Sequence, residues 1–343
     1  MHDMRLYGLA NFALKRGGSI HPITLPRELT NETGIMNPSI FLHNGRILLN
    51  IRHVNYTLYH SEGKKFPHVW GPLQYIHPEN DVTLRTHNVM CELDADMNLI
   101  SYGRIKMNLD TTPTWNFIGL EDGRLFSWDN RLFLCGVRRD CYDDKGKGRM
   151  EMCEIEFIDG EWQEVSRNPI PAPGANDTYC EKNWMPILDM PWHFLKWTNP
   201  TEIVKYDIEN RTTTTVVLDE TKKYPFPRDI RGGSQVVRIN EHQRMAITHE
   251  VDLFKDSFGR KDGHYVHRAI IFDNDWNIVH YTKDFHFMGY QRDPVTGYDY
   301  NIEFVTGLTF MNGNAYISYG FQDNGTFILR IPEKAFFEFL TKG

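Results

Sequence analysis

The amino-acid sequence predicts an all-β protein folded as a five-bladed β-propeller, for three reasons. Short apolar runs alternate with turn residues along almost the whole chain, as expected for strands joined by tight turns. Aromatic residues make up 13% of the 343 residues, which suits β-structure. A unit of polar start, strand, turn, strand, charged end and second strand pair occurs five times, and four strands repeated radially are typical of a propeller.

The clearest unit begins with the segment Gly119–Asp140, in which two apolar runs are joined by a turn at Asp129 and Asn130. This pattern predicts a β-hairpin. Its two open ends lie on the same side of the hairpin and carry the charged residues Glu121, Asp122, Arg124, Arg138, Arg139 and Asp140. Carboxylates and guanidinium groups are therefore expected to converge there.

Taken in order, the five units predict blades near residues 35–100, 115–167, 181–220, 229–284 and 300–332 of one domain, 1–343. We expect an early strand near Leu6–Leu14 to close the ring against the fifth unit, because closure leaves few exposed strand edges. The segment Glu333–Leu340 is the only good short helix candidate.

The composition argues against several classes of protein. A net charge of −7 speaks against a broadly basic nucleic-acid-binding surface, although not against a local basic cleft. The five cysteines show no CxxC spacing, which favours reduced thiols and a cytoplasmic location. No apolar run suits a signal peptide or a membrane span of roughly 20 residues. Zinc-ligand spacing, GxGxxG, P-loop and GxSxG patterns are absent, so we expect no metal, no cofactor and no membrane partner.

A propeller brings polar residues of different blades together. The first strand of each blade lines the central channel, so the starts of first strands and the ends of second strands meet at one mouth. The residues at these positions are Asn37, Arg52, Asn55, Glu121, Asp122, Arg124, Arg138, Arg139, Asp140, Lys182, Asn183, Asn199, Arg231, His249, Glu250, Glu303, Gln322 and Asp323. A shared structural role, such as hydrogen bonding between blades, would also explain their recurrence.

At these residues the sequence resembles the five-bladed β-propellers of glycoside hydrolase family 130, the mannoside phosphorylases, and the related β-1,2-mannosyltransferase/phosphorylases. The family's Glu-Asp-Pro-Arg segment, whose Asp acts as general acid, reads Glu121-Asp122-Gly123-Arg124 here, so the resemblance implies that Asp122 is catalytic. Further matches are Lys182, Asn183, Pro186, His249, Tyr265, Tyr319, Gly320 and Asp323. In phosphorylases the basic and hydroxyl members of this set hold phosphate.

The chain also resembles a group of uncharacterised propeller proteins of tailed bacteriophages, through its NPSI, NIRHVNY, EKNWMPI and RGGSQ segments. Phage enzymes of this size often add sugars to DNA bases. The resemblance therefore makes a hydroxymethylated DNA base a candidate acceptor and the host cytoplasm a candidate location.

Glycosyl chemistry needs a carboxylic acid near the leaving oxygen, and often a second carboxylate. Asp122 is the best acid or base candidate, and a phosphorylated donor would also need cations at the same mouth. The expected substrate- or phosphate-binding set is Asn37, Arg52, Asn55, Glu121, Arg124, Arg138, Arg139, Lys182, Asn183, Arg231, His249, Tyr265, Arg268, Glu303 and Asp323.

Structural alternatives stand beside these roles. Asp122 and Arg124 could form an ion pair, and His249 could satisfy a backbone carbonyl. The aromatic candidates for stacking on a sugar or a base are Trp115, Trp184, Trp192, Trp197 and Tyr319, of which at most two are expected at the ligand, because most large aromatics are core residues.

The sequence favours a glycosyltransferase that moves a sugar from a nucleotide sugar, or another sugar phosphate, to an oligosaccharide or a modified DNA base. A mouth rich in cations suits a phosphorylated donor better than it suits a hydrolase. The alternatives are a glycoside phosphorylase or hydrolase of the family 130 type, and a glycan-binding propeller without catalysis.

Overall fold

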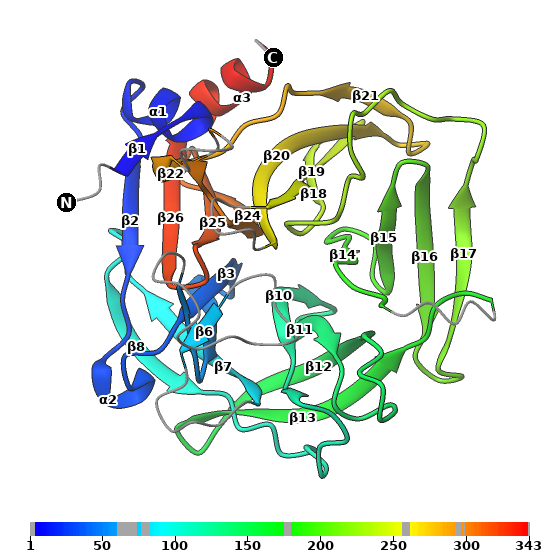
Figure 1. Ribbon diagram of the computed structural model, residues 1–343. Coiled ribbons are helices and arrows are strands. Elements are labelled where there is room, and N and C mark those ends of the chain that lie inside the picture. The colour runs from blue at the N-terminus through cyan, green and yellow to red at the C-terminus, as the bar shows by residue number, and fades with distance from the viewer. Residues whose placement is uncertain are drawn as a thin grey trace.

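The computed structural model describes residues 4–59, 74–76, 83–174, 180–255, 261–292, 297 and 299–341. Five sheets stand around a common centre in this part of the chain, each turned on edge towards the axis (Figure 1). The predicted five-bladed β-propeller is therefore confirmed. Each blade has four antiparallel strands, and the innermost strand of each blade borders the centre.

The first three blades follow one another along the chain. Blade 1 consists of β3 (Ile35–His43), β4 (Arg46–Val54), β7 (Leu84–Leu93) and β8 (Leu99–Arg104). Blade 2 consists of β10 (Glu121–Trp128), β11 (Arg131–Arg138), β12 (Arg149–Ile158) and β13 (Glu161–Ile170). Blade 3 consists of β14 (Met185–Pro186), β15 (His193–Thr198), β16 (Thr201–Asp207) and β17 (Thr212–Leu218).

The last two blades complete the ring. Blade 4 consists of β18 (Val237–Asn240), β19 (Gln243–Lys255), β20 (Lys261–Asp273) and β21 (Ile278–Tyr281). Blade 5 consists of β24 (Glu303–Met311), β25 (Asn314–Phe321), β26 (Gly325–Pro332) and, outermost, the early strand β2 (Ser19–Ile23).

The strand expected near Leu6–Leu14 is wrong, because that segment forms the helix α1 (Gly8–Leu14). Its buried residues Leu9, Ala10 and Ala13 lie on one helical face, a spacing that a short apolar run does not distinguish from a strand. The later strand β2 is the one that joins blade 5, where Ser19 to Ile23 pair with Arg330 to Thr326 of β26.

Helices are few in the described ranges. The helix expected at Glu333–Leu340 is confirmed as α3 (Glu333–Thr341), but it is not alone, since α1 and the four-residue α2 (Arg27–Thr30) are also present. Helix α1 packs against α3 beside blade 5 (Figure 1). No helix among the described residues is both long enough and apolar enough to cross a membrane.

The hydrophobic core lies between neighbouring blades, so inner strands are buried on both faces. Leu125 of β10 packs in a cluster with Leu48 and Met90 of blade 1. Its neighbour Phe126 packs in another cluster with Trp184 and Phe194 of blade 3. Successive side chains of a strand point to opposite faces, which explains why neighbouring positions such as Leu125 and Phe126 are both apolar.

Hydrogen bonds from one glutamine tie the inner strands together below the mouth. The Nε2 group of Gln235 donates to the Leu125 carbonyl at 2.5 Å and to Ser39 Oγ at 3.2 Å. Its Oε1 accepts from the Leu308 amide at 3.0 Å. Because Gln235 is fully buried, this side chain crosses the centre between blades 1, 2, 4 and 5. Gln235 therefore closes the centre below the mouth, and we call the mouth above it the cup.

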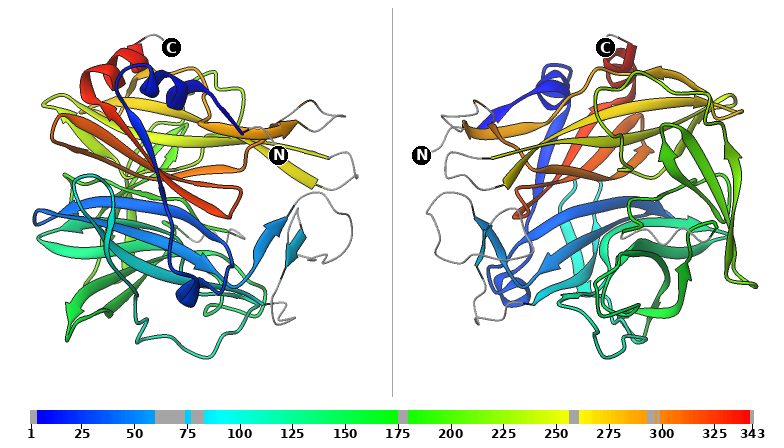
Figure 2. Two further views of the ribbon diagram at one scale, coloured as in Figure 1. Left: turned by 90° about the vertical axis from the view of Figure 1, so that its left-hand side faces the viewer. Right: turned by 45° about the vertical axis from the view of Figure 1, so that its right-hand side comes forward.

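Small elements stand out on one side of the ring. The hairpin of β5 (Thr57–Tyr59) and β6 (Gln74–Ile76), the far ends of β19 and β20, and the sheet of β1 (Met4–Leu6), β22 (Met288–Arg292) and β23 (Asp299–Tyr300) project in the same direction (Figure 2). Strands β4 and β19 are second strands of their blades, and their ends point to this side. These elements therefore stand around the mouth at which the candidate residues were expected. The two-residue β9 (Phe117–Ile118) pairs with β7.

Candidate active site

The same backbone feature occurs near the start of three inner strands, β3, β10 and β14. Asn37, Asp122 and Asn183 have φ angles of 46°, 53° and 64°, in the left-handed region that Asn and Asp tolerate better than other side chains. The register of β10 against β11 shifts between Glu121 and Arg124, as in a β-bulge, and bulges redirect side chains next to functional sites. This geometry turns the Asp122 side chain towards the centre of the mouth.

Gly123 fits this turn because the space beside it is filled. A Cβ atom at this position would lie 2.6 Å from Leu134 Cδ1, so a side chain would displace the core of blade 2. The glycine therefore serves a close approach between β10 and β11, and packing holds the backbone that carries Asp122.

The Asp122 carboxylate is held through one of its oxygens. Asn37 Nδ2 donates to Asp122 Oδ1 at 2.7 Å, and Arg52 Nη1 donates to the same oxygen at 2.9 Å. Burial acts to raise the pKa of Asp122, but Arg52, the Asn37 hydrogen bond, Arg124 and Lys182 together lower it. Asp122 is therefore ionised at neutral pH, and its side chain keeps 15% exposure for contact with a ligand.

A second carboxylate lies beside it. Arg52 Nη2 is 3.3 Å from Glu121 Oε2, and Arg139 Nε is 3.8 Å from Glu121 Oε1. Burial acts to lower the pKa of Arg52, but the nearby carboxylates of Asp122, Glu121 and Asp323 outweigh this effect and raise it. The structure thus brings together residues of blades 1, 2 and 5. We call this group the Asp122 centre; it consists of Asn37, Arg52, Glu121, Asp122 and Asp323.

Tyr56 belongs to this centre, although it was not among the residues predicted from the sequence pattern. Its ring is buried, and burial raises the pKa of its hydroxyl, an effect that Arg52 opposes and the carboxylates of Asp323 and Glu121 reinforce. The signal was its place two residues after the end of β4, where a second strand reaches the mouth.

Arg124 crosses from blade 2 to blades 3 and 4. Its guanidinium donates to the Asp122 carbonyl at 2.8 Å, to the Gly233 carbonyl at 2.9 Å and to Asn183 Oδ1 at 3.3 Å. The side chain is fully buried, and its guanidinium carbon lies 5.3 Å from the Phe304 ring centroid. These contacts make Arg124 and Asn183 positioning residues that fix the two sides of the cup relative to each other.

The far side of the cup carries His249. Its Nδ1–H donates to the Gly232 carbonyl at 3.0 Å, and its ring stacks on Tyr265 with centroids 6.0 Å apart. Burial, His267 and the cations Lys182, Arg231 and Arg124 lower the pKa of His249 well below its usual value. The neutral ring therefore keeps Nε2 as an acceptor.

Two cations lie beside this histidine. Arg231 pairs with His249 across the ladder, with both backbone hydrogen bonds at 2.9 Å, so their side chains leave the same face. Lys182 is exposed and contributes to the lowered pKa values of both Asp122 and His249. Among the residues described, neither Lys182 nor Arg231 has a carboxylate oxygen within 4.0 Å, which leaves both charges for an anionic ligand.

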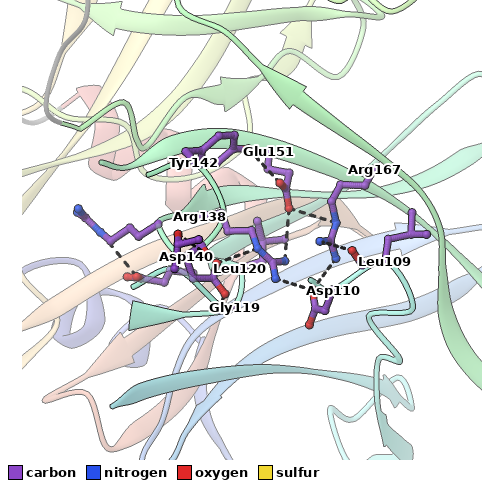
Figure 3. Close-up of polar contacts among 12 residues, drawn as sticks. Leu109, Asp110, Gly119, Leu120, Arg138, Asp140, Tyr142, Glu151 and Arg167 are labelled. Atoms are coloured by element: carbon purple, nitrogen blue, oxygen red, sulfur yellow. Dashed lines mark hydrogen bonds and ion pairs between the residues drawn. The ribbon is translucent and has the colours of Figure 1, made fainter. Parts of the chain in front are cut away.

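Arg138 is not at this mouth, which corrects the expectation. Its side chain is 1% exposed and donates to Asp140 Oδ1 at 2.9 Å, to Glu151 Oε1 at 3.5 Å and to Asp110. Arg167 and Tyr142 complete this cluster of polar side chains between strands of blade 2 and the segment before it (Figure 3). These ion pairs engage Arg138 and Asp140, which also line the cavity between blades 1 and 2, whereas the neighbouring Arg139 faces Glu121.

Arg268 and Glu250 also pair with each other and not with the Asp122 centre. Arg268 Nε donates to Glu250 Oε1, and Arg268 Nη1 donates to the Thr282 carbonyl at 2.8 Å. On β19, His249 and Glu250 point to opposite faces, so only the histidine reaches the cup. The expected phosphate role of Arg268 is therefore corrected.

Two asparagines have local structural roles. Asn55 joins the end of β4 to the start of β7, because its Nδ2 donates to the Thr83 carbonyl at 3.1 Å and its Oδ1 accepts from the Arg85 amide at 2.7 Å. Asn199 bonds to both backbone groups of Tyr224, each at 3.0 Å. The ligand role expected of Asn55 is thus replaced by a contact that shapes the rim.

Glu303 also has another function than expected. Its carboxylate accepts from the Phe287 amide at 2.9 Å and from the Met288 amide at 2.6 Å, and burial raises its pKa well above the usual value. It therefore fixes the start of β22 from inside. His267 is equally buried, and its Nδ1 lies 4.0 Å from Glu303 Oε2.

The buried His267 predicts a pH-dependent stability. Burial lowers the pKa of His267 from 6.5 to about 3, so its contribution to stability is present above pH 6.5 and is lost as the pH falls towards 3. Replacing it, His267→Phe, should make the free energy of unfolding less steep in pH by about 1.4 kcal/mol per pH unit in this window. Urea unfolding of both proteins between pH 7 and pH 4.5 measures this, and parallel pH profiles would contradict it.

Two cavities flank the Asp122 centre. One, of about 310 Å³, lies between blades 1 and 2 and is lined by Thr86, His87, Asp110 and Asp140 among others. The other, of about 280 Å³, lies between blades 3 and 4 and includes Lys182, Asn183, Arg231 and Trp197. Of the aromatic candidates, Trp184 and Tyr319 are core residues, whereas Trp197 is 46% exposed in this second cavity.

The described residues contain no group of three or more His, Cys, Asp or Glu side chains that could hold a metal ion. The two D-x-D sequences lie in hairpin turns, where Asp94 accepts from the Asp96 and Asn98 amides and Asp273 accepts from those of Asp275 and Asn277. Those carboxylates are therefore occupied by turn hydrogen bonds.

No protein-family model and no curated protein matches this sequence. Solved structures do match its fold. One comes from a study of glycoside hydrolase family 130, a family of mannoside phosphorylases that contains hydrolases of β-1,2-mannosidic linkages in Candida mannan. This structure has a TM-score of 0.57 and 14% identity, and the match covers 88% of this chain and 85% of that one.

Two further solved structures match over most of the chain. A β-1,2-mannobiose phosphorylase from Listeria innocua, solved with β-1,2-mannobiose, has a TM-score of 0.53 and 12% identity over 91% of this chain and 93% of its own. A glycosyl hydrolase from Bacteroides ovatus has a TM-score of 0.54 and 12% identity over 88% of this chain and 85% of its own. At these identities, the matches show that this chain shares the propeller fold of family 130 proteins.

Proposed function

We propose that this chain is a carbohydrate-active enzyme that transfers a sugar from a phosphorylated donor to an acceptor hydroxyl. The observation that carries the proposal is an ionised Asp122 carboxylate, fixed by Asn37 and Arg52, in a cup that also holds Lys182 and Arg231. A fixed carboxylate beside cations without carboxylate partners, among the residues described, suits a reaction in which a phosphate leaves. The shared fold with family 130 proteins supports carbohydrate chemistry by analogy.

The proposed step uses these groups in two roles. The acceptor oxygen forms a bond to the anomeric carbon while the bond from that carbon to the phosphate oxygen breaks and the electron pair leaves with the phosphate. Asp122 takes the proton of the attacking hydroxyl, and Lys182 and Arg231 stabilise the charge on the departing phosphate. The lowered pKa keeps Asp122 deprotonated at neutral pH and so ready to accept a proton, and in the reverse direction the same group would return the proton.

Binding of the donor would raise the pKa of Asp122. A phosphate anion beside Lys182 offsets part of the positive potential that lowers the pKa of Asp122. The carboxylate would then become a stronger base once the donor is in place. This coupling would link proton transfer to occupation of the cup.

A glycoside phosphorylase is the second candidate, because the same cup could bind inorganic phosphate as the nucleophile. The matched phosphorylase from Listeria innocua supports this alternative by analogy. A glycan-binding propeller without catalysis is the third. Neither the fold nor the comparisons bear on a phage origin or on a DNA acceptor, so both remain predictions from the sequence.

A donor screen tests the proposal. The purified protein would be incubated with nucleotide sugars and, separately, with sugar 1-phosphates, each with mixed oligosaccharides or with hydroxymethylated DNA. Acceptor-dependent release of nucleoside diphosphate would support transfer, and release of phosphate from one sugar 1-phosphate would favour the phosphorylase. Glycan binding without any release across the panel would contradict both enzyme readings.

A further inference from the structure

The cavity between blades 3 and 4 has features that the proposed chemistry does not yet use. It is about 280 Å³ in volume, and Asn183 and Gly232 form its inner wall. Both are also partners of Arg124, which donates to Asn183 Oδ1 at 3.3 Å, to the Gly232 carbonyl at 3.4 Å and to the Asp122 carbonyl at 2.8 Å. The Arg124 guanidinium therefore links the inner wall of the cavity to the backbone of Asp122.

The lining of this cavity carries more cations than carboxylates. Lys182 and Arg231 line it together with the carboxylates of Glu181 and Asp229, but no carboxylate oxygen lies within 4.0 Å of either cation in the described ranges. Lys196 also lines it, but its ammonium is bound to Glu202 at 3.1 Å and 3.3 Å. Two of the three cations are therefore available to an anion, and both lie next to His249.

The outer half presents a flat ring. The register of β15 against β16 shifts between Leu195 and Trp197, so Lys196 is the extra residue of a bulge. The bulge turns the indole of Trp197 outwards, with 46% exposure, whereas Phe194 and Leu195 of the same strand are fully buried. A large aromatic side chain that shares a cavity with Lys182 and Arg231 is a platform for a planar ring.

The cavity on the other side of the centre differs in its charges. It is lined by Asp110 and Asp140 together with Arg85 and Arg138. Arg138 is bound to Asp110, Asp140 and the adjacent Glu151, so its charge is already balanced by carboxylates, which disfavours a phosphate there. A diphosphate is therefore expected on the Lys182 side.

We propose that the cavity between blades 3 and 4 is a nucleoside diphosphate subsite, in which Lys182 and Arg231 bind the diphosphate and Trp197 stacks on the nucleobase. The proposal rests on the proposed function, because it names how a nucleotide donor would lie. The sugar would project past Asn183 towards Asp122, and the base would lie at the outer rim, so the diphosphate would span the distance between the two.

Calorimetric binding without turnover tests the subsite. The probes are the diphosphates of guanosine, uridine, adenosine and cytidine, with inorganic pyrophosphate as the probe that lacks a base. At least one nucleoside diphosphate should bind about 5- to 150-fold tighter than pyrophosphate, the range expected for stacking of one base on an aromatic ring. Equal affinities for all probes would overturn the proposal.

Variants of Trp197 separate the ring from the charges. Trp197→Leu should remove the preference for nucleoside diphosphate over pyrophosphate without weakening pyrophosphate, and Trp197→Phe should restore part of it. The matched control is Phe157→Leu, which alters an aromatic ring that is 52% exposed on β12. A preference that survives Trp197→Leu would overturn the assignment. The double variant Lys182→Gln/Arg231→Gln should weaken pyrophosphate and nucleoside diphosphates alike.

The result can be told apart from a failure of the proposed function. Turnover of sugar 1-phosphates without nucleoside diphosphate binding would overturn the subsite and leave the enzyme assignment intact. Tight, Trp197-dependent binding of a nucleoside diphosphate without turnover of any donor would support the subsite and contradict the proposed transfer.

Discussion

Asp122→Asn should lower turnover by about 10²- to 10⁴-fold, the usual contribution of a positioned acid or base. The amide cannot take the proton of the attacking hydroxyl, but it keeps the shape of the carboxylate. Asparagine also tolerates the left-handed backbone at this position, where φ is 53°. Arg52 retains Glu121 as a partner, at 3.3 Å, so the fold and donor binding should change little.

The measurement pairs steady-state kinetics with donor affinity. Asp129→Asn is the matched control, because Asp129 also has a left-handed φ, 51°, but lies exposed in the turn at the far end of the same hairpin. That variant should keep full activity. Full activity in Asp122→Asn would remove Asp122 from the proton-transfer role, and equal losses in both variants would point to a folding defect.

Arg138→Met should destabilise the fold by about 3–5 kcal/mol, the cost of leaving buried charges without their partner. Arg138 binds Asp140, Glu151 and Asp110, and the first two are almost completely buried (Figure 3). Burial already raises the pKa of Glu151, and Arg138 and Arg167 are the cations that oppose this. Methionine has a similar length and removes the charge, so the loss reports the ion pairs more than a cavity.

Urea unfolding at neutral pH measures the difference. Arg131→Met is the control in the same strand, since Arg131 pairs with Glu154 at 2.5 Å but its side chain is 41% exposed. An exposed pair contributes about 0–1 kcal/mol, so this variant should unfold near the wild-type midpoint. If Arg138→Met and Arg131→Met lower the free energy of unfolding equally, the buried cluster does not stabilise the fold as its burial indicates. Donor affinity at the folded Arg138→Met protein should be unchanged, because Arg138 does not face the cup.

Much of the strand arrangement is encoded locally. Alternating apolar residues and turns at positions such as Asn44-Gly45 and Asp129-Asn130 predicted the hairpins, because a strand's side-chain period and a tight turn's backbone need only neighbouring residues. The N-terminal helix α1 was not predicted, because a short apolar run with Leu9, Ala10 and Ala13 fits both the helical and the strand period. In the folded chain this segment packs as a helix against α3.

The sequence by itself determined the blade order and the place of Glu121 and Asp122 at the start of an inner strand. Only the tertiary structure decided which neighbours face the cup. Arg139 and His249 do, whereas Arg138 and Glu250 face away. Adjacent side chains of a strand point to opposite faces, and the bulges at Glu121/Arg124 and Leu195/Trp197 shift that phase by one residue. A one-residue shift leaves the sequence pattern almost unchanged but moves a charge from the mouth into the core. The side chain that faces the mouth is therefore decided only when the blades pack.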